Sequence, residues 1–376
     1  MSASISKIAV LSCALTLVLH GCIGDNTGMH GQVRFDIGYG NSDMALELSQ
    51  KTDSPVDMVV REGIFHFLSR GEAKILRLSA YGQPMAMLYD PSRGSFPLLL
   101  KEAIKLSFQE PGPLAVDSRQ TIYVADRQSG SDGWIIRRIA SEGRELPFLG
   151  REGPGGTALP FVARLDIVAN DGLAVTCLTS KEYLVWFYDR SGSYQYSLVL
   201  DRDRLPVPES IMEAVREESG KRVIPSIETL IPAFAGGKSA VVAKMDYFIV
   251  PKESVARMTV SPEYAGSWIL RADPSTGMVE KAFRLPENSQ DNGGGFHLLA
   301  VEKDNVVLMK WDDMGLGGTI FNFNFAGRVQ GKSRFASEQK SARLVSWAGG
   351  NDGFLYILAS LPDTLRLYAL RIPGWR

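Results

Sequence analysis

The chain has 376 residues, of which 22% are charged and 45% hydrophobic, and its formal net charge is −1. A chain this close to neutral has no broad basic field, which argues against nucleic acid as a partner. The 37 Gly and 19 Pro suit a turn-rich β protein, and the presence of only 4 His argues against a His-rich metal site.

The first 21 residues have the pattern of an export signal. Lys7 precedes an uninterrupted apolar run at residues 8–19, which is too short to cross the ~30 Å core of a bilayer as a helix. The run ends in "HGC", which resembles the lipobox of bacterial lipoproteins, in a relaxed form like that of spirochaetes because His20 replaces the usual small residue. The resemblance implies cleavage after residue 21 and acylation of Cys22. An ordinary secretory signal or an uncleaved anchor is the alternative.

The next segment and the cysteines fit an exported, lipid-anchored domain. Residues 22–31 are small, polar and Gly-rich, and we expect a short tether there. Several acyl chains on one cysteine, at about 0.8 kcal/mol per buried methylene, would hold a domain stably at a membrane. Without the signal only Cys22 and Cys177 remain, so no disulfide framework is expected. Cys177 lies in the apolar run "LAVTCLT" and is predicted to be a buried small hydrophobic residue.

From residue 54 onward the chain repeats a unit of apolar run, turn, apolar run, and then a second such pair. Six copies can be followed, the last without its final strand, at residues 54–89, 112–149, 163–200, 238–285, 296–335 and 342–372. The turns carry Gly, Asn or Asp, for example at Glu62-Gly63 and Asp171-Gly172. Four strands in about fifty residues are typical of a propeller blade, whose two apolar faces are covered by its neighbours.

The sixth copy lacks its last strand, and the beginning of the domain can supply one. Either "QVRFDIG" at residues 32–38 or "MALELSQ" at residues 44–50 could complete the sixth sheet. Such closure would remove an exposed sheet edge. We therefore predict one all-β propeller domain over residues 32–376.

Two copies carry a more specific resemblance. "GPLAVDSRQTIYVAD" at residues 112–126 and the segment at residues 148–176 are similar to the NHL repeat, with a Pro, an apolar-Asp pair, a turn and an aromatic-Val-Ala-Asp strand end. The resemblance covers about a quarter of the chain and implies a six-bladed β-propeller of NHL or TolB-like type. A seventh, degenerate blade remains the alternative count.

Residues 201–234 interrupt the repeat and are predicted to form a small helical insertion. "ESIMEAVREES" places Ile211, Met212 and Val215 on one side of a short amphipathic helix that Pro208 opens. We expect the insertion to lie over the edge of the propeller. A cap that gates a ligand or a partner is the alternative, because long insertions are natural places for function.

Carboxylates are the main candidates for chemistry, since the chain has no nucleophile elbow, phosphate loop, Cys-x-x-Cys pair or zinc-binding helix. Asp57, Asp117 and Asp166 recur at positions that the repeat makes equivalent in the first three copies. In lactonase-like propellers such side chains converge on a channel cation that activates water. We interpret the three as turn and hairpin residues that bind backbone N–H groups, and we expect no metal and no cofactor.

Three other side chains are assigned by their surroundings. His66 and His297 lie in apolar strands and are predicted to be satisfied core residues. Trp375, beyond Pro373, is the one aromatic residue that looks free of the repeat.

Three functions remain open at this stage. The first is a lipid-anchored binding or scaffold module of the bacterial envelope, with a protein partner and no catalysis. The second is a metal-dependent, lactonase-like hydrolase or lyase with its site in the channel, and the third is a factor in outer-membrane protein assembly. Ile23 follows the cysteine where Asp would favour retention in the inner membrane, so the outer membrane is the expected location.

Overall fold

The computed structural model describes residues 31–40, 45–46, 56–93, 102–130, 133–217, 220–251, 261–286, 295–312, 317–336, 342–350 and 352–375. The predicted signal peptide, Cys22 and all but the last residue of the tether lie outside these residues. Among the described residues, no helix combines the length and the apolar character that crossing a membrane would require.

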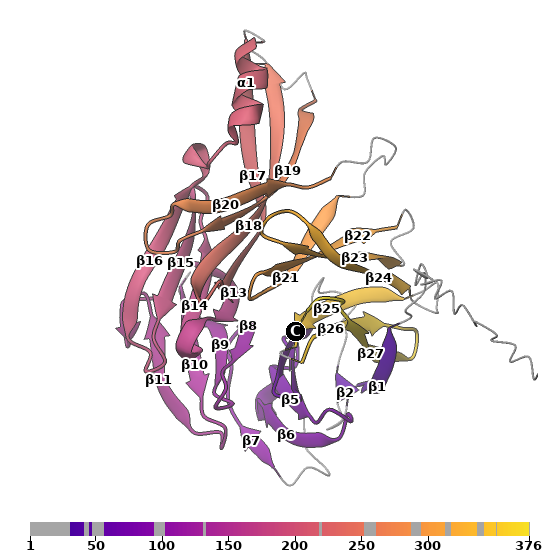
Figure 1. Cartoon of the computed structure of the whole chain (residues 1–376). Helices are drawn as coiled ribbons and strands as arrows, with labels where there is room; N and C mark the ends of the chain where they lie inside the picture. Colours follow the sequence, from indigo (N-terminus) through magenta and orange to yellow (C-terminus); the bar gives the residue numbers. More distant parts are fainter. Residues whose placement is uncertain are drawn as a thin grey trace, which may run out of the picture.

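Six sheets radiate from a common centre, and each corresponds to one propeller blade (Figure 1). Blade one holds β3 (Val56–Arg61), β4 (Ile64–Ser69), β5 (Lys74–Leu78), β6 (Pro84–Tyr89) and β7 (Ala103–Lys105). Blade two holds β8 (Pro111–Val116), β9 (Ile122–Arg127), β10 (Trp134–Ile139), β11 (Glu145–Gly150) and β12 (Gly153–Pro154). Blade three holds β13 (Phe161–Ile167), β14 (Leu173–Leu178), β15 (Glu182–Tyr188) and β16 (Tyr194–Asp201).

The second half of the chain forms the other three blades. Blade four holds β17 (Lys221–Ala235), β18 (Lys238–Pro251), β19 (Glu263–Ala272) and β20 (Val279–Arg284). Blade five holds β21 (Phe296–Glu302), β22 (Asn305–Trp311), β23 (Gly317–Asn324) and β24 (Val329–Ala336). Blade six holds β25 (Arg343–Gly349), β26 (Phe354–Ser360), β27 (Thr364–Arg371), β1 (Gln32–Tyr39) and β2 (Ala45–Leu46). The predicted six-bladed propeller is therefore confirmed.

The ring is closed by the strand that the sequence offered for this purpose. β1 pairs antiparallel with β27, and β2 adds a short parallel bridge outside it. Arg366 of β27 donates to both carboxylate oxygens of Asp36 at 2.8 Å. On the far side, the buried ammonium of Lys74 in blade one donates to the Ala45 carbonyl at 2.7 Å. β1 thus completes blade six, and β2 ties it to blade one.

The hairpin turns follow the expected chemistry, with one shift. Glu62 and Gly63 both have positive φ angles, of 52° and 74°, as a two-residue hairpin turn between twisted strands requires. In blade three the positive φ angles fall one residue earlier than predicted, on Asn170 (58°) and Asp171 (56°), whereas Gly172 is extended at −68°. The shift places the Asp171 carboxylate at the end of the central channel.

Six buried apolar clusters, one between each pair of neighbouring blades, hold the ring together. Between blades two and three, Tyr123 and Trp134 pack with Trp186 and Cys177. Cys177 is fully buried, as predicted, and burial raises the pKa of its thiol well above the ordinary value. Each blade therefore buries both faces, as propeller packing demands.

The predicted insertion is shorter than residues 201–234. It contains the 3-10 turn Arg202–Arg204 and the helix α1 (Glu209–Glu217), whose Ile211 packs with Ile227 and Tyr247. Residues 221–234, expected to belong to it, form all but the last residue of β17, the innermost strand of blade four. Pro225 and Pro232 are tolerated in β17 because one edge of this strand has no strand partner.

Two further 3-10 turns complete the described secondary structure, at Pro91–Arg93 and Ala169–Asp171. In blade four, β17 and β18 are 15 and 14 residues long. Together with the start of β19 they project beyond the ring, and α1 lies beside them (Figure 1).

Candidate ligand channel

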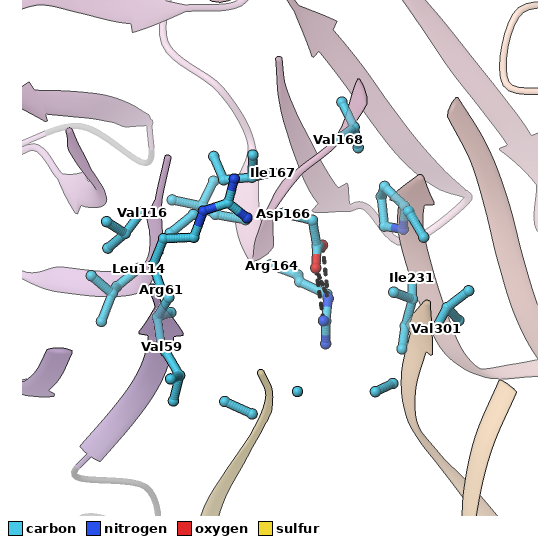
Figure 2. Close-up of a pocket in the computed structure, with 18 of the residues that line it drawn as sticks. Val59, Arg61, Leu114, Val116, Arg164, Asp166, Ile167, Val168, Ile231 and Val301 are labelled. Carbon is cyan, nitrogen blue, oxygen red and sulfur yellow. Dashed lines mark hydrogen bonds and ion pairs between the residues drawn. The ribbon is translucent and has the colours of Figure 1, made fainter. Parts of the chain in front are cut away.

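A cavity of about 980 Å³ lies at the centre of the ring. Its walls come from the innermost strand of every blade, β3, β8, β13, β17, β21 and β25, and from the turns that follow them. Figure 2 shows apolar side chains of four different blades, among them Val59, Leu114, Ile231 and Val301, around this space. A cavity of this size is typical of small-molecule sites.

The polar side chains of the cavity are concentrated in two blades. Blade one supplies Asp57, Arg61 and Arg70, and blade three supplies Arg164, Asp166, Asp171 and Arg190. Blade five adds Glu302 and Lys303 at the end where β21 turns into β22. The lining contributed by blades two, four and six is mostly apolar.

The first charged group, which we call the inner belt, consists of Asp57, Arg70, Arg164 and Asp166. Nε of Arg164 lies 2.8 and 2.7 Å from the two carboxylate oxygens of Asp166, as Figure 2 shows. Arg70 donates to Asp57 at 2.7 Å. Burial raises the pKa of both carboxyl groups, and the adjacent guanidinium groups oppose that rise. The belt is therefore a set of Arg–carboxylate pairs with geometry close to ideal.

The second charged group, which we call the rim cluster, joins three blades around the Asp171 carboxylate. The Asp171 carboxylate accepts hydrogen bonds from the Ser118 hydroxyl at 2.5 Å and the Ser118 N–H at 3.3 Å. Nη2 of Arg61 lies 3.2 Å from one oxygen, and Nη2 of Arg190 lies 3.5 Å from the other. These bonds and charges lower the pKa of Asp171 although burial opposes them. One carboxylate thus faces two arginines.

Glu302 is an acidic side chain of the cavity whose proton is held more tightly than in water. Burial raises its pKa to about 7, the Asp352 carboxylate adds to the rise and Lys303 opposes it. One carboxyl oxygen, Oε2, is buried and has no hydrogen-bond partner among the described residues. Near neutral pH this group can therefore offer or withdraw a proton inside the cavity.

The three predicted carboxylates are not structurally equivalent. Asp57 pairs with Leu68 near the start of β3, and Asp166 pairs with Ala174 near the end of β13. Asp117 follows β8 and does not line the cavity. The three Asp residues therefore lie at different distances from the hairpin turns that follow their strands, and the expected equivalence is wrong.

The surroundings of these carboxylates also show what each one binds. Asp117 accepts from the N–H groups of Arg119 and Thr121 at 2.9 and 2.8 Å and from the Tyr123 hydroxyl at 3.2 Å, which is the turn role that we interpreted for it. Asp57 and Asp166 bind arginines where a lactonase-like site would hold a cation, so they do not fit a divalent metal. Within the described residues, no three His, Cys, Asp or Glu side chains gather as metal ligands.

Three assignments of single side chains need correction. His66 is fully buried and burial lowers its pKa to about 3, yet neither ring nitrogen makes a hydrogen bond of good geometry within the described residues. His297 is not a core residue, because its side chain is 46% exposed and Nδ1 lies 2.7 Å from Glu228. Trp375 is not free of the repeat, because it is buried between blades five and six and also lines the cavity.

The arginines of the cavity were missed at the sequence level. Arg61 directly precedes a hairpin turn, and Arg164 lies two residues before Asp166, as is common for ordinary solvated charges. A search for basic residues near the ends of successive first strands would have flagged both. Only the closed ring brings them to one cavity with Arg70 and Arg190.

No protein-family model matches this chain, and no curated protein matches it either. Among solved structures it is similar to a gluconolactonase from Xanthomonas campestris (13% identity, 85% of this chain and 87% of that one, TM-score 0.42). It is also similar to BamB from Moraxella catarrhalis (12%, 92% and 95%, 0.40) and to the Dos1 propeller (13%, 86% and 69%, 0.39). The chain is a six-bladed β-propeller. That conclusion rests on its own sheet order, and the NHL similarity of two copies stays a resemblance.

Proposed function

We propose that this chain is a binding module of a bacterial envelope, held at the membrane by lipid on Cys22, that takes a small ligand into its central channel. The observation that carries the proposal is the cavity of about 980 Å³, in which all six blades meet around two charged groups. A packed structural core would fill such a space with side chains. A cavity of this size that combines apolar walls with convergent polar groups is instead the usual form of a ligand site.

The charged groups favour binding over metal-dependent hydrolysis. A water-activating cation needs carboxylate oxygens that are free to coordinate it. In the inner belt those oxygens are held by Arg70 and Arg164 at 2.7–2.8 Å. A guanidinium in that place repels a divalent cation, so the pairs support recognition of a ligand by position and charge.

The channel can be tested with a variant that fills it. Val301 lies on the wall of the cavity (Figure 2), and Val301→Trp would occupy part of the space. We expect native mass spectrometry of protein purified from its own envelope to show a small-molecule adduct on the parent and on Val301→Ala, but not on Val301→Trp. Equal adducts on all three variants, each with a normal melting temperature, would place the ligand elsewhere and contradict the proposal.

The anchor is tested separately. Replacing Cys22 by Ser removes the thiol that would be acylated, so detergent phase partitioning should move the protein to the aqueous phase. A Cys13→Ser variant is the matched control, because Cys13 lies within the predicted signal. Retention of Cys22→Ser in the detergent phase would mean that the lipid is not the anchor.

A further inference from the structure

The charges that line the channel do not balance. Five basic side chains (Arg61, Arg70, Arg164, Arg190 and Lys303) face four acidic ones (Asp57, Asp166, Asp171 and Glu302). The excess is positive, and partial protonation of Glu302 would increase it. A ligand that enters this cavity therefore meets a potential that favours an anion.

The two arginines of the rim cluster share one carboxylate, whereas each arginine of the inner belt has a carboxylate of its own. A guanidinium has five N–H donors. Arg164 directs Nε and Nη2 at Asp166, so its fork is already engaged. Arg61 and Arg190 each reach the single Asp171 carboxylate through Nη2. The Nε of each is buried, so any N–H group offered to a ligand comes from the far end of the guanidinium. Their side chains are 21% and 39% exposed, so both reach the cavity.

An apolar surface lies across the ring from these arginines. Blade four is opposite blade one in the order of the six sheets, and blade six is opposite blade three. Phe234 lies two residues before the hairpin turn that joins β17 to β18, and Arg61 directly precedes the turn that joins β3 to β4. Both residues therefore lie toward the same end of the channel. Phe234 is 46% exposed and Trp347 of blade six is 37% exposed, although both are large and apolar.

From these features we infer that the ligand is an organic anion with an apolar body, bound by its acidic group at Arg61 and Arg190 and by its body against Phe234 and Trp347. This inference rests on the proposed function, because it names the class of ligand that the channel takes. The planar, forked donors of arginine suit a carboxylate or a phosphate monoester equally, and the shared chemistry is an oxyanion that accepts two N–H bonds. The apolar body gains from covering two aromatic rings that otherwise face water.

The test uses three probes that share one phenyl-alkyl body: phenylbutyrate, its neutral amide phenylbutyramide, and phenylpropyl phosphate. Binding to the full domain is measured by calorimetry or by NMR shifts of the tryptophan N–H signals. We expect the anions to bind about tenfold more tightly than the amide, a difference of about 1.4 kcal/mol. Comparison of the carboxylate with the phosphate then tells which oxyanion the rim cluster prefers.

Variants locate the effect. Arg61→Gln combined with Arg190→Gln should remove the preference for anions and leave amide binding unchanged, and Phe234→Ala should weaken all three probes. Arg144→Gln, at an exposed arginine that pairs with Glu142 outside the cavity, is the control. The double Lys variant of Arg61 and Arg190 keeps both charges and should retain the preference, which separates loss of charge from loss of fold.

Two results would overturn the inference: an amide that binds as tightly as the anions, or an anion preference that survives the double Gln variant. Absence of binding by every probe at millimolar concentration would overturn it as well. None of these outcomes decides the proposed function, because the adduct lost on Val301→Trp is measured on the natural ligand. If Val301→Trp loses the adduct while the parent binds the amide as tightly as the anions, the proposed binding function stands and only the anionic class of the ligand is rejected.

Discussion

The two halves of the ring supply different kinds of side chain to the central channel. Blades one and three supply seven charged side chains to the cavity, whereas blades four and six supply the exposed aromatic side chains Phe234 and Trp347. The backbone arrangement is the same on both sides, since each half consists of three radial sheets. The inner strand of each sheet is short except in blade four, where β17 is extended. The difference shows that the repeat determines the architecture, while a few side chains at the ends of the inner strands give the channel its chemistry.

The halves meet at a seam that the N-terminal strand closes, and the largest effect is expected there. Ile37 of β1 is 2% exposed and packs in the cluster between blades six and one. Ile37→Ala should lower the free energy of unfolding by about 3 kcal/mol through lost burial and a residual cavity. Urea unfolding measures this, with Val33→Ala as an exposed control in the same strand. A loss under about 1 kcal/mol would mean that β1 contributes little to closure.

The charged half should be sensitive to the loss of a single carboxylate. Asp166→Ala leaves Arg164 without its partner, and we expect a loss of about 2 kcal/mol in unfolding free energy. Fully buried pairs cost more, about 3–5 kcal/mol, but the Arg164 side chain is 39% exposed and part of the charge is solvated. Asp166→Asn keeps an acceptor and should lose about half as much. Unchanged stability of Asp166→Ala would show that the Arg164–Asp166 pair contributes little to the free energy of unfolding.

The pH dependence of stability tests Glu302 of blade five, the acidic side chain that the second half of the ring adds to the cavity. Its pKa is raised from 4.5 to about 7 in the folded state, so the folded protein binds the proton more tightly than the unfolded chain. This contribution is complete below pH 4.5 and is lost as the pH rises to about 7. The full rise of the pKa would correspond to about 3.4 kcal/mol, and because the side chain is partly exposed we expect stability to fall by about 2 kcal/mol over that window. Glu302→Gln should remove this part of the slope. Parallel profiles for the two proteins would exclude Glu302 as the group responsible.

The apolar half should give the smallest change in stability. Phe234 is 46% exposed in the folded protein, so Phe234→Ala removes little buried area and should cost no more than about 0.5 kcal/mol. Thermal melting measures this, with Phe283→Ala as a control in the same blade, because Phe283 is buried at 9% exposure. A large loss at Phe234 would mean that the residue supports the fold and is not available to a ligand.

Much of the fold could be predicted from the sequence because its strands and turns are local. Alternating apolar runs with Gly, Asn and Asp at the corners predicted the six blades. For the closing strand the sequence left residues 32–38 and 44–50 open, and the pairing of β1 with β27 decides for the first. Residues 221–234 were assigned to the insertion because they follow the helical pattern and interrupt the repeat, but they belong to β17.

The site could be predicted less well. Asp57, Asp117 and Asp166 were interpreted from the sequence as turn residues. Asp117 has that role, but Asp57 and Asp166 line the cavity and bind arginines, which the local sequence pattern does not reveal. Arg61, Arg164 and Arg190 look like ordinary surface charges in sequence. Their convergence depends on ring closure between residues more than one hundred positions apart, for example Arg61 with Asp171.

The most direct measurement is an experimental structure of the domain with phenylbutyrate bound. The account predicts a carboxylate that accepts hydrogen bonds from Arg61 and Arg190 and a phenyl ring in contact with Phe234 or Trp347, with the Arg164–Asp166 pair intact. A probe that lies outside the cavity, or a carboxylate that displaces Asp166 from Arg164 while the rim arginines stay on Asp171 alone, would contradict it.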